Sequence, residues 1–383
     1  MRFRAGSRLA AGCLAALAAL IAGGGASLLG TCGPFTDVAA DAFCPLVLEV
    51  FYMGITTGTT PTTYDPTSNV SRLQMAAFLS RTVDGVVRRG SRRSALDQFW
   101  NAATQVTTVG TAPIGVKSDG LDVWVANNGS GTVSRVRASD GKLVDTWTGS
   151  LGGRAVVCAG GKVNVVAAST PNGTLYHIDP LQPPGAASVV ATNLGDLSRA
   201  IAFDGSRLWT ANNFSVSIVT PTAIPPWTVT TVTTGFGQMG GVVFDGSHIW
   251  ATDGSAASLV QLGPSGAILQ TVTVGALPQF PVFDGTNIWV PNFTGTSISI
   301  VRASTGAVLA TLTGNGLSQP ASGAFDGQRV LITSNNSSNV SLWKAADLTP
   351  LGFFDVGANS SRACSDGIDF WITQASAGTL VRF

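Results

Sequence analysis

Phe283-Asp284-Gly285-Thr286-Asn287-Ile288-Trp289-Val290-Pro291-Asn292 is the stretch that decides the fold, because the chain repeats it from about residue 105 onward. Close copies occupy residues 203–212 and 244–250, and weaker copies begin at residues 118, 159, 325 and 365. The Asp of the motif, or the Gly that replaces it at 160, stands at positions 119, 160, 204, 245, 284, 326 and 366, so the interval is 39–44 residues. A period of about 40 residues with strand-like content is typical of a β-propeller.

One repeat predicts four strands. In the copy around Asp284 these are residues 280–283, 287–291, 297–301 and 308–312, with the Asp-Gly pair as the first hairpin turn. The last copy ends at Phe383 after its third strand, and a strand-like stretch at 105–110 precedes the first copy. We expect this stretch to complete the last blade, which would close the ring and remove an exposed edge.

The sequence thus predicts an all-β fold at residues 105–383, a seven-bladed β-propeller with four-stranded blades. This part resembles the YVTN/NHL-like propellers in its repeats. That resemblance implies the fold and leaves the activity open, because such propellers carry many functions.

An aromatic residue recurs five positions after the motif Asp. It is found at Trp124, Trp209, Trp250, Trp289 and Trp371, while Val165 and Leu331 replace it in the other two repeats. A row of aromatics could stack on sugars, but a place in the middle of the second strand of each blade favours the core between blades. The Asp-Gly pairs are likewise expected to form turns and not a cluster of carboxylates.

Composition excludes several functional classes. The 383 residues are 45% apolar and 11% charged with a net charge of +1, which gives no basic excess for a nucleic-acid partner. The only Glu is Glu49, and the only His residues, His177 and His248, fall at unlike positions of different repeats. No metal-ligand cluster, cofactor or catalytic set is therefore predicted.

We expect a binding protein rather than an enzyme. The alternative is an exported propeller lyase or hydrolase. Streptogramin lyases are seven-bladed propellers that use His and Glu with a metal, whereas this propeller lacks Glu.

The ligand-binding face is expected opposite the Asp-Gly turns. The loops between the second and third strands, and the connections from each blade to the next, meet there near the central channel. The predicted binding residues are Asn127, Asn212, Asp253, Asn292, Asn335, Gln374, Arg199 and Arg362, and the connections also supply Arg154, Met239, Phe280 and Gln319. Amides suit a glycan or a peptide backbone, so an unknown glycan or protein is the expected partner. The alternative for each Asn is a role in its own turn.

The first 31 residues have the pattern of a secretory signal peptide. Arg2, Arg4 and Arg8 precede an apolar run at 9–22, and small residues follow at 23–27. We therefore expect an exported protein, either extracellular or associated with the cell envelope.

Cys32 allows two alternatives for the N-terminus that remains after removal of the signal peptide. Residues 29–32 resemble a lipoprotein signal, in which Cys32 would carry a lipid; alternatively Cys32 and Cys44 form a disulfide. Cys158 and Cys364 fall in blades that are not neighbours, so a disulfide between them is not expected, and both are predicted to be small buried side chains.

Residues 33–90 are predicted to form a small helical module, followed by a linker at 91–104. Apolar spacing predicts helices at 43–53 and 71–81, with Ser71 and Gln74 as a capping box. Phe35-Thr36-Asp37-Val38, Gly54-Ile55-Thr56-Thr57-Gly58, Tyr64-Asp65-Pro66 and Val70-Ser71-Arg72-Leu73-Gln74-Met75-Ala76 resemble an S-layer homology (SLH) module.

The SLH resemblance implies attachment to a cell-wall polymer or peptidoglycan, with Arg72 as the first candidate for contact with an acidic polymer. Such modules usually occur in threes, whereas this chain has one, and Gln74 stands where the family has Glu. The alternative is a compact stalk without a wall ligand.

Overall fold

The computed structural model describes residues 32–39, 43–52, 56–79, 105–335 and 337–383. Contacts divide the chain into two units, Met1–Ala95 and Leu96–Phe383. The predicted signal peptide and the linker at 91–104 lie outside the described residues. Within the described ranges no helix is long and apolar enough to cross a membrane.

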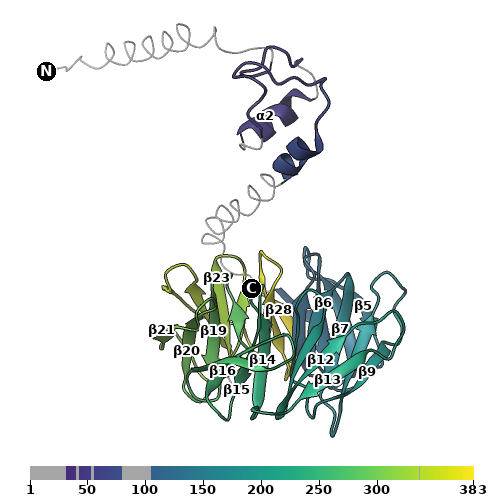
Figure 1. Ribbon diagram of the computed structural model, residues 1–383, viewed down its shortest axis with the longest axis vertical. Helices are drawn as coiled ribbons and strands as arrows, with labels where there is room; N and C mark the ends of the chain where they lie inside the picture. Colours follow the sequence, from purple (N-terminus) through teal and green to yellow (C-terminus); the bar gives the residue numbers. More distant parts are fainter. Residues whose placement is uncertain (1–31, 40–42, 53–55, 80–104, 336) are drawn as a thin grey trace, which may run out of the picture. The chain divides into compact units, whose positions relative to one another are not determined.

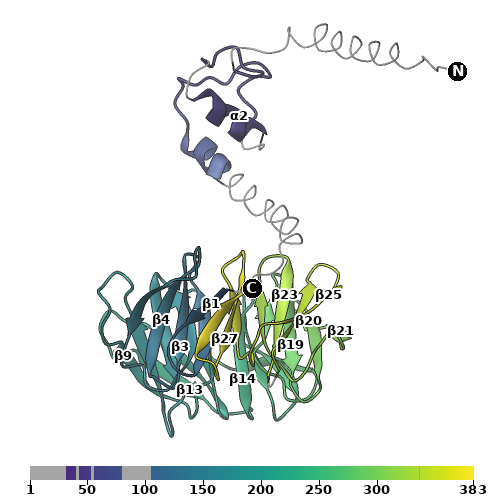
Figure 2. The ribbon, with the colours of Figure 1, turned by 180° about the vertical axis from the view of Figure 1, so that it is seen from behind.

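The larger unit consists of seven four-stranded antiparallel sheets, the blades, arranged around a central axis (Figures 1 and 2). The first strand of each blade is β2 (Pro113–Ser118), β6 (Gly153–Ala159), β10 (Ala200–Phe203), β14 (Met239–Phe244), β18 (Val282–Phe283), β22 (Pro320–Phe325) or β26 (Ala363–Ser365). The second is β3 (Asp122–Asn127), β7 (Lys162–Ala167), β11 (Leu208–Asn212), β15 (Ile249–Asp253), β19 (Asn287–Asn292), β23 (Arg329–Ser334) or β27 (Phe370–Gln374).

The two outer strands complete each blade. The third strand is β4 (Thr132–Arg137), β8 (Gly173–Ile178), β12 (Ser215–Thr220), β16 (Ser258–Leu262), β20 (Ser297–Arg302), β24 (Asn339–Lys344) or β28 (Thr379–Arg382). The fourth is β5 (Leu143–Trp147), β9 (Ser188–Leu194), β13 (Thr228–Val232), β17 (Ile268–Thr273), β21 (Val308–Leu312), β25 (Pro350–Asp355) or β1 (Gln105–Thr108). The blades are numbered 1 to 7 in the order in which their first strands appear.

The ring is closed as the sequence predicts. Strand β1 pairs antiparallel with β28, with Gln105 opposite Arg382 and Thr108 opposite Thr379. Thr107 Oγ1 donates to the Gly141 carbonyl at 2.6 Å, and Gln105 Nε2 donates to the Asp140 carbonyl at 2.6 Å, so β1 also ties blade 7 to blade 1.

One predicted strand is shorter than expected. In blade 5 the first strand was expected at 280–283, but β18 pairs with β19 only through Val282 and Phe283. Pro281 has no N–H to donate to a ladder, and the Phe280 N–H donates to Ala321 of blade 6 at 3.0 Å. The prediction of pairing within the blade at residue 280 is therefore wrong.

The motif Asp organises each turn between the first two strands. Asp284 Oδ1 accepts the N–H groups of Thr286 and Asn287 at 2.8 and 2.6 Å, and its Oδ2 accepts Trp289 Nε1 at 2.7 Å. Gly285 has a φ of +93°, which disfavours any residue with a Cβ. The Asp-Gly pair is thus turn chemistry, as predicted.

The same bond from indole to carboxylate occurs in five blades. The bonds are 2.7–2.9 Å long and join Trp124 to Asp119, Trp209 to Asp204, Trp250 to Asp245, Trp289 to Asp284 and Trp371 to Asp366. These indoles are at most 1% exposed, which confirms the prediction that they form core rather than a sugar platform. Burial alone would raise the pKa of Asp204, but hydrogen bonds from Trp209, Arg207 and Ser206 outweigh it and lower the pKa to about 2.

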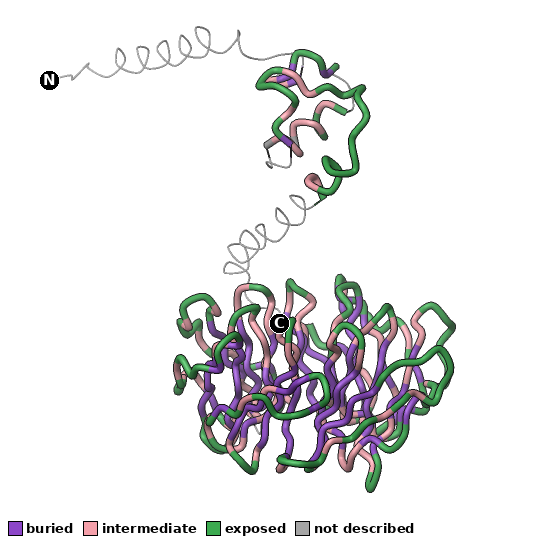
Figure 3. Tube along the Cα trace, in the orientation of Figure 1, coloured by how far each residue is buried: buried purple, intermediate pink, exposed green. Residues whose placement is uncertain are grey.

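The core lies between adjacent blades. Trp209 of blade 3, for example, belongs to one buried cluster with Met239, Val242 and Ile249 of blade 4. Figure 3 shows buried backbone along the strands of the propeller and exposed backbone in the loops. Because the strands are rigid and packed, loop residues are held in fixed positions around the axis.

The N-terminal unit has a small core of its own. A disulfide joins Cys32 to Cys44 at the start of helix α2 (Cys44–Tyr52). The buried ring of Phe35 packs edge-on against Phe51 at 5.0 Å between ring centroids. Of the apolar face predicted for this helix, Leu46 is instead 56% exposed, because the stripe that contains Val47, Leu48 and Phe51 packs on Phe35.

Two of the sequence blocks in this unit are in direct contact. The Asp37 carboxylate accepts the N–H groups of Tyr64 and Asp65 at 2.8 and 2.7 Å, and the bond from Tyr64 lowers the pKa of Asp37. Residues 72–79 are helical. Ser71 and Gln74 form the predicted capping box, with bonds of 2.8 Å from Ser71 N–H and 3.2 Å to Ser71 Oγ.

Candidate functional site

Three of the predicted binding amides are turned inward. Asn127, Asn212 and Asn292 end the second strand of their blades and are fully buried. Asn292 Nδ2 donates to Ser297 Oγ and Ser299 Oγ of the next strand, both at 3.0 Å. Equivalent pairs hold the other two, Thr132 and Ser134 for Asn127, and Ser215 and Ser217 for Asn212.

Asp253 and Gln374 occupy the same position in blades 4 and 7 and are also buried. The Asp253 carboxylate accepts the N–H groups of Gly237, Ser255 and Ala256 at 2.7–3.1 Å. Gln374 Nε2 donates to the Val356 carbonyl at 2.6 Å. These five side chains serve their turns and present no exposed face to a ligand, so they are removed from the predicted binding set, and the alternative interpretation holds for them.

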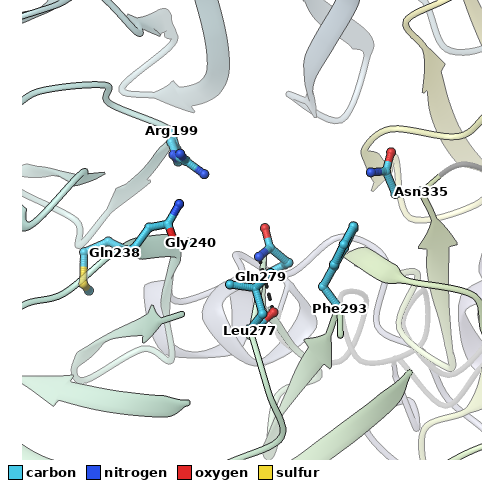
Figure 4. Close-up of a pocket in the computed structure, with 8 residues that line it drawn as sticks. Arg199, Gln238, Gly240, Leu277, Gln279, Phe293 and Asn335 are labelled. Atoms are coloured by element: carbon cyan, nitrogen blue, oxygen red, sulfur yellow. Dashed lines mark hydrogen bonds between the residues drawn. The ribbon is translucent and has the colours of Figure 1, made fainter. Parts of the chain in front are cut away.

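Two of the three remaining predicted residues, Arg199 and Asn335, line a cavity with a volume of about 280 Å³. Figure 4 shows their side chains on opposite sides of a common opening. We call this space the mouth cavity. Its main lining side chains are Arg199, Gln238, Leu277, Gln279, Phe293 and Asn335.

The mouth cavity is built by loops from blades 3 to 6. Arg199, Gln238 and Gln279 lie just before the first strands β10, β14 and β18, whereas Phe293 and Asn335 follow the second strands β19 and β23. These are the loops that the sequence predicted for the binding face. Gln238, Leu277 and Gln279 were missed, although their place just before a first strand, shared with Arg199, could have indicated them.

Arg362 crosses the centre of the propeller. It lies just before β26 in blade 7, and its Nη2 donates to the backbone carbonyl of Arg199 in blade 3 at 2.8 Å. Its guanidinium carbon lies 3.7 Å from the ring centroid of Phe280 in blade 5. Phe280 directly follows the cavity residue Gln279, so Arg362 contacts two of the segments that form the mouth cavity.

Three positively charged side chains, Arg154, Arg199 and Arg362, lie near one another. Burial, and then the charges of Arg154 and Arg199, lower the pKa of Arg362 to about 9. Burial and the charge of Arg199 also lower the pKa of Arg154, which lies at the start of β6 in blade 2. The sequence placed these three arginines on the connections between blades, and the structure brings the three cations within electrostatic reach of one another.

No catalytic set accompanies this cavity within the described ranges. His177 Nδ1 lies 3.0 Å from Asn164 Oδ1, and its ring packs edge-on against Trp227, while burial lowers its pKa. His248 follows the Asp-Gly turn of blade 4, at the other end of the strands. No group of three or more His, Cys, Asp or Glu in the described part of the chain could hold a metal ion.

The two cysteines of the propeller are free thiols. Burial raises the pKa of Cys158 to about 12 and raises that of Cys364 as well, so both are protonated at neutral pH and neither is an activated nucleophile. Arg72, the candidate for wall binding, is exposed at the start of the helix at 72–79.

Comparison with known proteins agrees on the fold. No family model matches the chain. No curated protein matches it either. Solved structures do match. Virginiamycin B lyase from Staphylococcus aureus is 13% identical, with a TM-score of 0.62 over 73% of this chain and 98% of that one.

Two further solved structures are similar to a comparable extent. The WD40 β-propeller domain of Doa1 is 13% identical, with a TM-score of 0.60 over 74% of this chain and 95% of that one. Hydrazine synthase from Kuenenia stuttgartiensis is 16% identical, with a TM-score of 0.61 over 74% and 98%. At these identities the likeness extends to the fold alone.

Proposed function

We propose that this chain is an exported binding protein whose propeller recognises a glycan or protein of the cell envelope at the mouth cavity. The observation that carries the proposal is the composition of this cavity. Its wall combines one arginine, three amides and the half-buried ring of Phe293. Concave sites with an aromatic surface and a few convergent polar groups are the usual form of ligand sites.

Export is supported by the sequence of residues 1–31, which lies outside the described residues, and by the disulfide between Cys32 and Cys44. Disulfides persist mainly in oxidising compartments outside the cytosol. No nucleic-acid partner is proposed, because the chain carries a net charge of only +1.

The N-terminal unit is proposed to be an SLH-like anchor that binds a cell-wall polymer or peptidoglycan. The contact of Asp37 with residues 64 and 65 supports it, because it joins two blocks on which the resemblance rests. Arg72 is exposed and available to an acidic polymer. In this arrangement the anchor would hold the protein at the envelope while the propeller binds its ligand.

Co-sedimentation with isolated bacterial envelopes tests the proposal. We expect the full chain to pellet, Arg72→Gln to weaken retention by the anchor, and Phe293→Ala to weaken the contribution of the propeller several-fold. Phe214→Ala is the matched control, because Phe214 is an exposed phenylalanine in the loop after β11, as Phe293 is in the loop after β19, and it does not line the cavity. Equal retention of the Phe293 and Phe214 variants would exclude the mouth cavity, and failure of the full chain to pellet would exclude envelope binding.

The second candidate is an exported lyase or hydrolase, because the propeller fold of this chain is shared with virginiamycin B lyase. Metal analysis of the purified protein separates the two candidates. Stoichiometric divalent metal would favour the enzyme, whereas metal-free protein that still pellets with envelopes would favour the binding protein.

A further inference from the structure

Three arginines from blades 2, 3 and 7 converge at the centre of the propeller. Arg154, Arg199 and Arg362 all lie at or just before the first strand of their blades, which is the strand nearest the axis. The contacts of Arg362 with the Arg199 carbonyl and the Phe280 ring fix its guanidinium across the channel. Arg199 at the same time lines the mouth cavity.

The three cations lack acidic partners in the described part of the chain. On the face with the Asp-Gly turns, by contrast, five basic side chains are paired within 4.0 Å: Arg135 with Asp122, Lys162 with Asp179, Arg207 with Asp204, Arg329 with Asp326 and Arg382 with Asp369. The two carboxylates nearest in sequence to the cavity loops do not neutralise the charge of the three arginines. Asp253 is used by three backbone N–H groups, and Asp196, three residues before Arg199, makes no ion pair with the arginines.

One donor of the cluster also lacks an acceptor. Arg199 Nε is buried and has no hydrogen-bond partner in the described protein. Gathering like charges away from bulk water is unfavourable, and so is a buried donor without an acceptor. The cluster therefore opposes folding unless something with negative charge and acceptor oxygens joins it.

We propose that Arg154, Arg199 and Arg362 form an oxyanion site that binds phosphate, either free or as a phosphate ester of the ligand that enters the mouth cavity. This inference rests on the proposed binding function and names the chemistry of its ligand. Guanidinium groups donate paired N–H bonds that match the oxygens of phosphate, and such charge-assisted bonds are the strong ones.

The neighbouring groups suit the uncharged remainder of a phosphate ester. Gln238, Gln279 and Asn335 supply amide donors and acceptors around the cavity, and Phe293 supplies an apolar surface. A cavity of about 280 Å³ is large enough for a phosphate and a small attached group. A carboxylate offers only two oxygens to three guanidiniums, whereas a phosphate monoester offers three terminal oxygens and inorganic phosphate four, so the site should prefer phosphate over acetate.

Calorimetric titration of the full chain at pH 7 tests the proposal, with inorganic phosphate, glycerol phosphate, glycerol and acetate as probes. We expect phosphate or its ester to bind, acetate to bind at least tenfold more weakly, and glycerol not to bind. Preference for the ester would assign the site to an esterified ligand, and equal or better binding of inorganic phosphate would assign it to the free ion. No binding of either phosphate probe, or acetate binding as tight as phosphate, would overturn the proposal.

Variants locate the site. Arg362→Gln and Arg199→Gln should weaken phosphate binding at least tenfold, whereas Arg302→Gln should not change it, because Arg302 is the last residue of β20, at the end of the strand away from the mouth cavity. Equal affinity of the Arg362 and Arg302 variants would overturn the assignment. Arg154→Gln separates loss of phosphate binding from loss of folding. It removes repulsion without removing a hydrogen bond, so its melting temperature in phosphate-free buffer should equal or exceed that of the wild type, while its stabilisation by phosphate is lost.

The two proposals fail separately. Envelope binding without any phosphate binding would overturn the oxyanion site and retain the recognition function. Phosphate binding without envelope binding would retain the oxyanion site and overturn recognition of the envelope.

Discussion

Removal of residues 105–111 from the full chain should lower the melting temperature by about 10 °C. The deletion removes β1, so blade 7 loses its fourth strand and the bonds from Gln105 and Thr107 to blade 1 are lost. At about 1 kcal/mol for each hydrogen bond, the lost bonds amount to roughly 5 kcal/mol. For a domain of this size, 1 kcal/mol corresponds to about 2 °C in the melting temperature.

Differential scanning calorimetry measures this effect. A control chain in which residues 105–108 become Gly-Ser-Gly-Ser keeps the chain length and should lose only part of the stability, because backbone pairing with β28 is retained. The exposed edge of β28 should also make the deleted chain aggregate more readily. An unchanged melting temperature in the deleted chain would show that ring closure by β1 does not stabilise the propeller.

Asp284→Ala should destabilise the propeller by about 3–4 kcal/mol. It removes one carboxylate that accepts two backbone N–H groups and the indole of Trp289. Trp289 is fully buried, so its Nε1–H would lose its protein acceptor. Hydrogen bonds to charged groups contribute about 1.5–3 kcal/mol, and a buried donor left alone costs about 1–3 kcal/mol.

Blade 6 offers a matched control for this effect. Asp326 accepts the N–H groups of Gln328 and Arg329 as Asp284 does those of its turn, but Leu331 replaces the Trp, and Arg329 Nε bonds to Asp326 Oδ2 at 2.7 Å. Arg329 can reach water after Asp326→Ala, so that variant should lose less stability in urea unfolding than Asp284→Ala. If the two variants lose the same stability, the bond from the indole contributes nothing.

Much of the fold follows from the period of the motif. Spacing alone predicted the seven blades and the closing strand, because each repeat carries a complete set of strands and turns. The pairing of Asp with Trp was not predicted, yet the sequence holds a signal for it. Gly160 and Val165 replace both members in blade 2, and although blade 6 keeps Asp326 with Leu331, each of the five repeats with the Trp also has the Asp.

The amides were misjudged because a loop position does not imply exposure. Asn127 and Asn292 are each followed by Ser or Thr at the fifth and seventh positions, which are the hydroxyls that they bind. That spacing could have indicated a structural role. These amides thus satisfy the ends of their own strands, whereas the next residues along the chain, such as Phe293 after Asn292, line the mouth cavity.

The arginine cluster could not be derived from spacing. Arg154, Arg199 and Arg362 lie in three different repeats, and Arg199 and Arg362 are 163 residues apart. Their convergence depends on the length and direction of side chains that cross the channel. Repeat patterns fix which loops meet at one face, but they do not fix which side chains reach its centre.

Hydrogen exchange of the full chain, with and without a soluble envelope extract that it binds, tests recognition at the mouth cavity most directly. The account predicts slower exchange at residues 236–241, 276–281 and 333–335, with unchanged exchange at the Asp-Gly turns around residues 245 and 284. Protection confined to those turns, or to the N-terminal unit, would contradict it, because the ligand would then be held away from the mouth cavity.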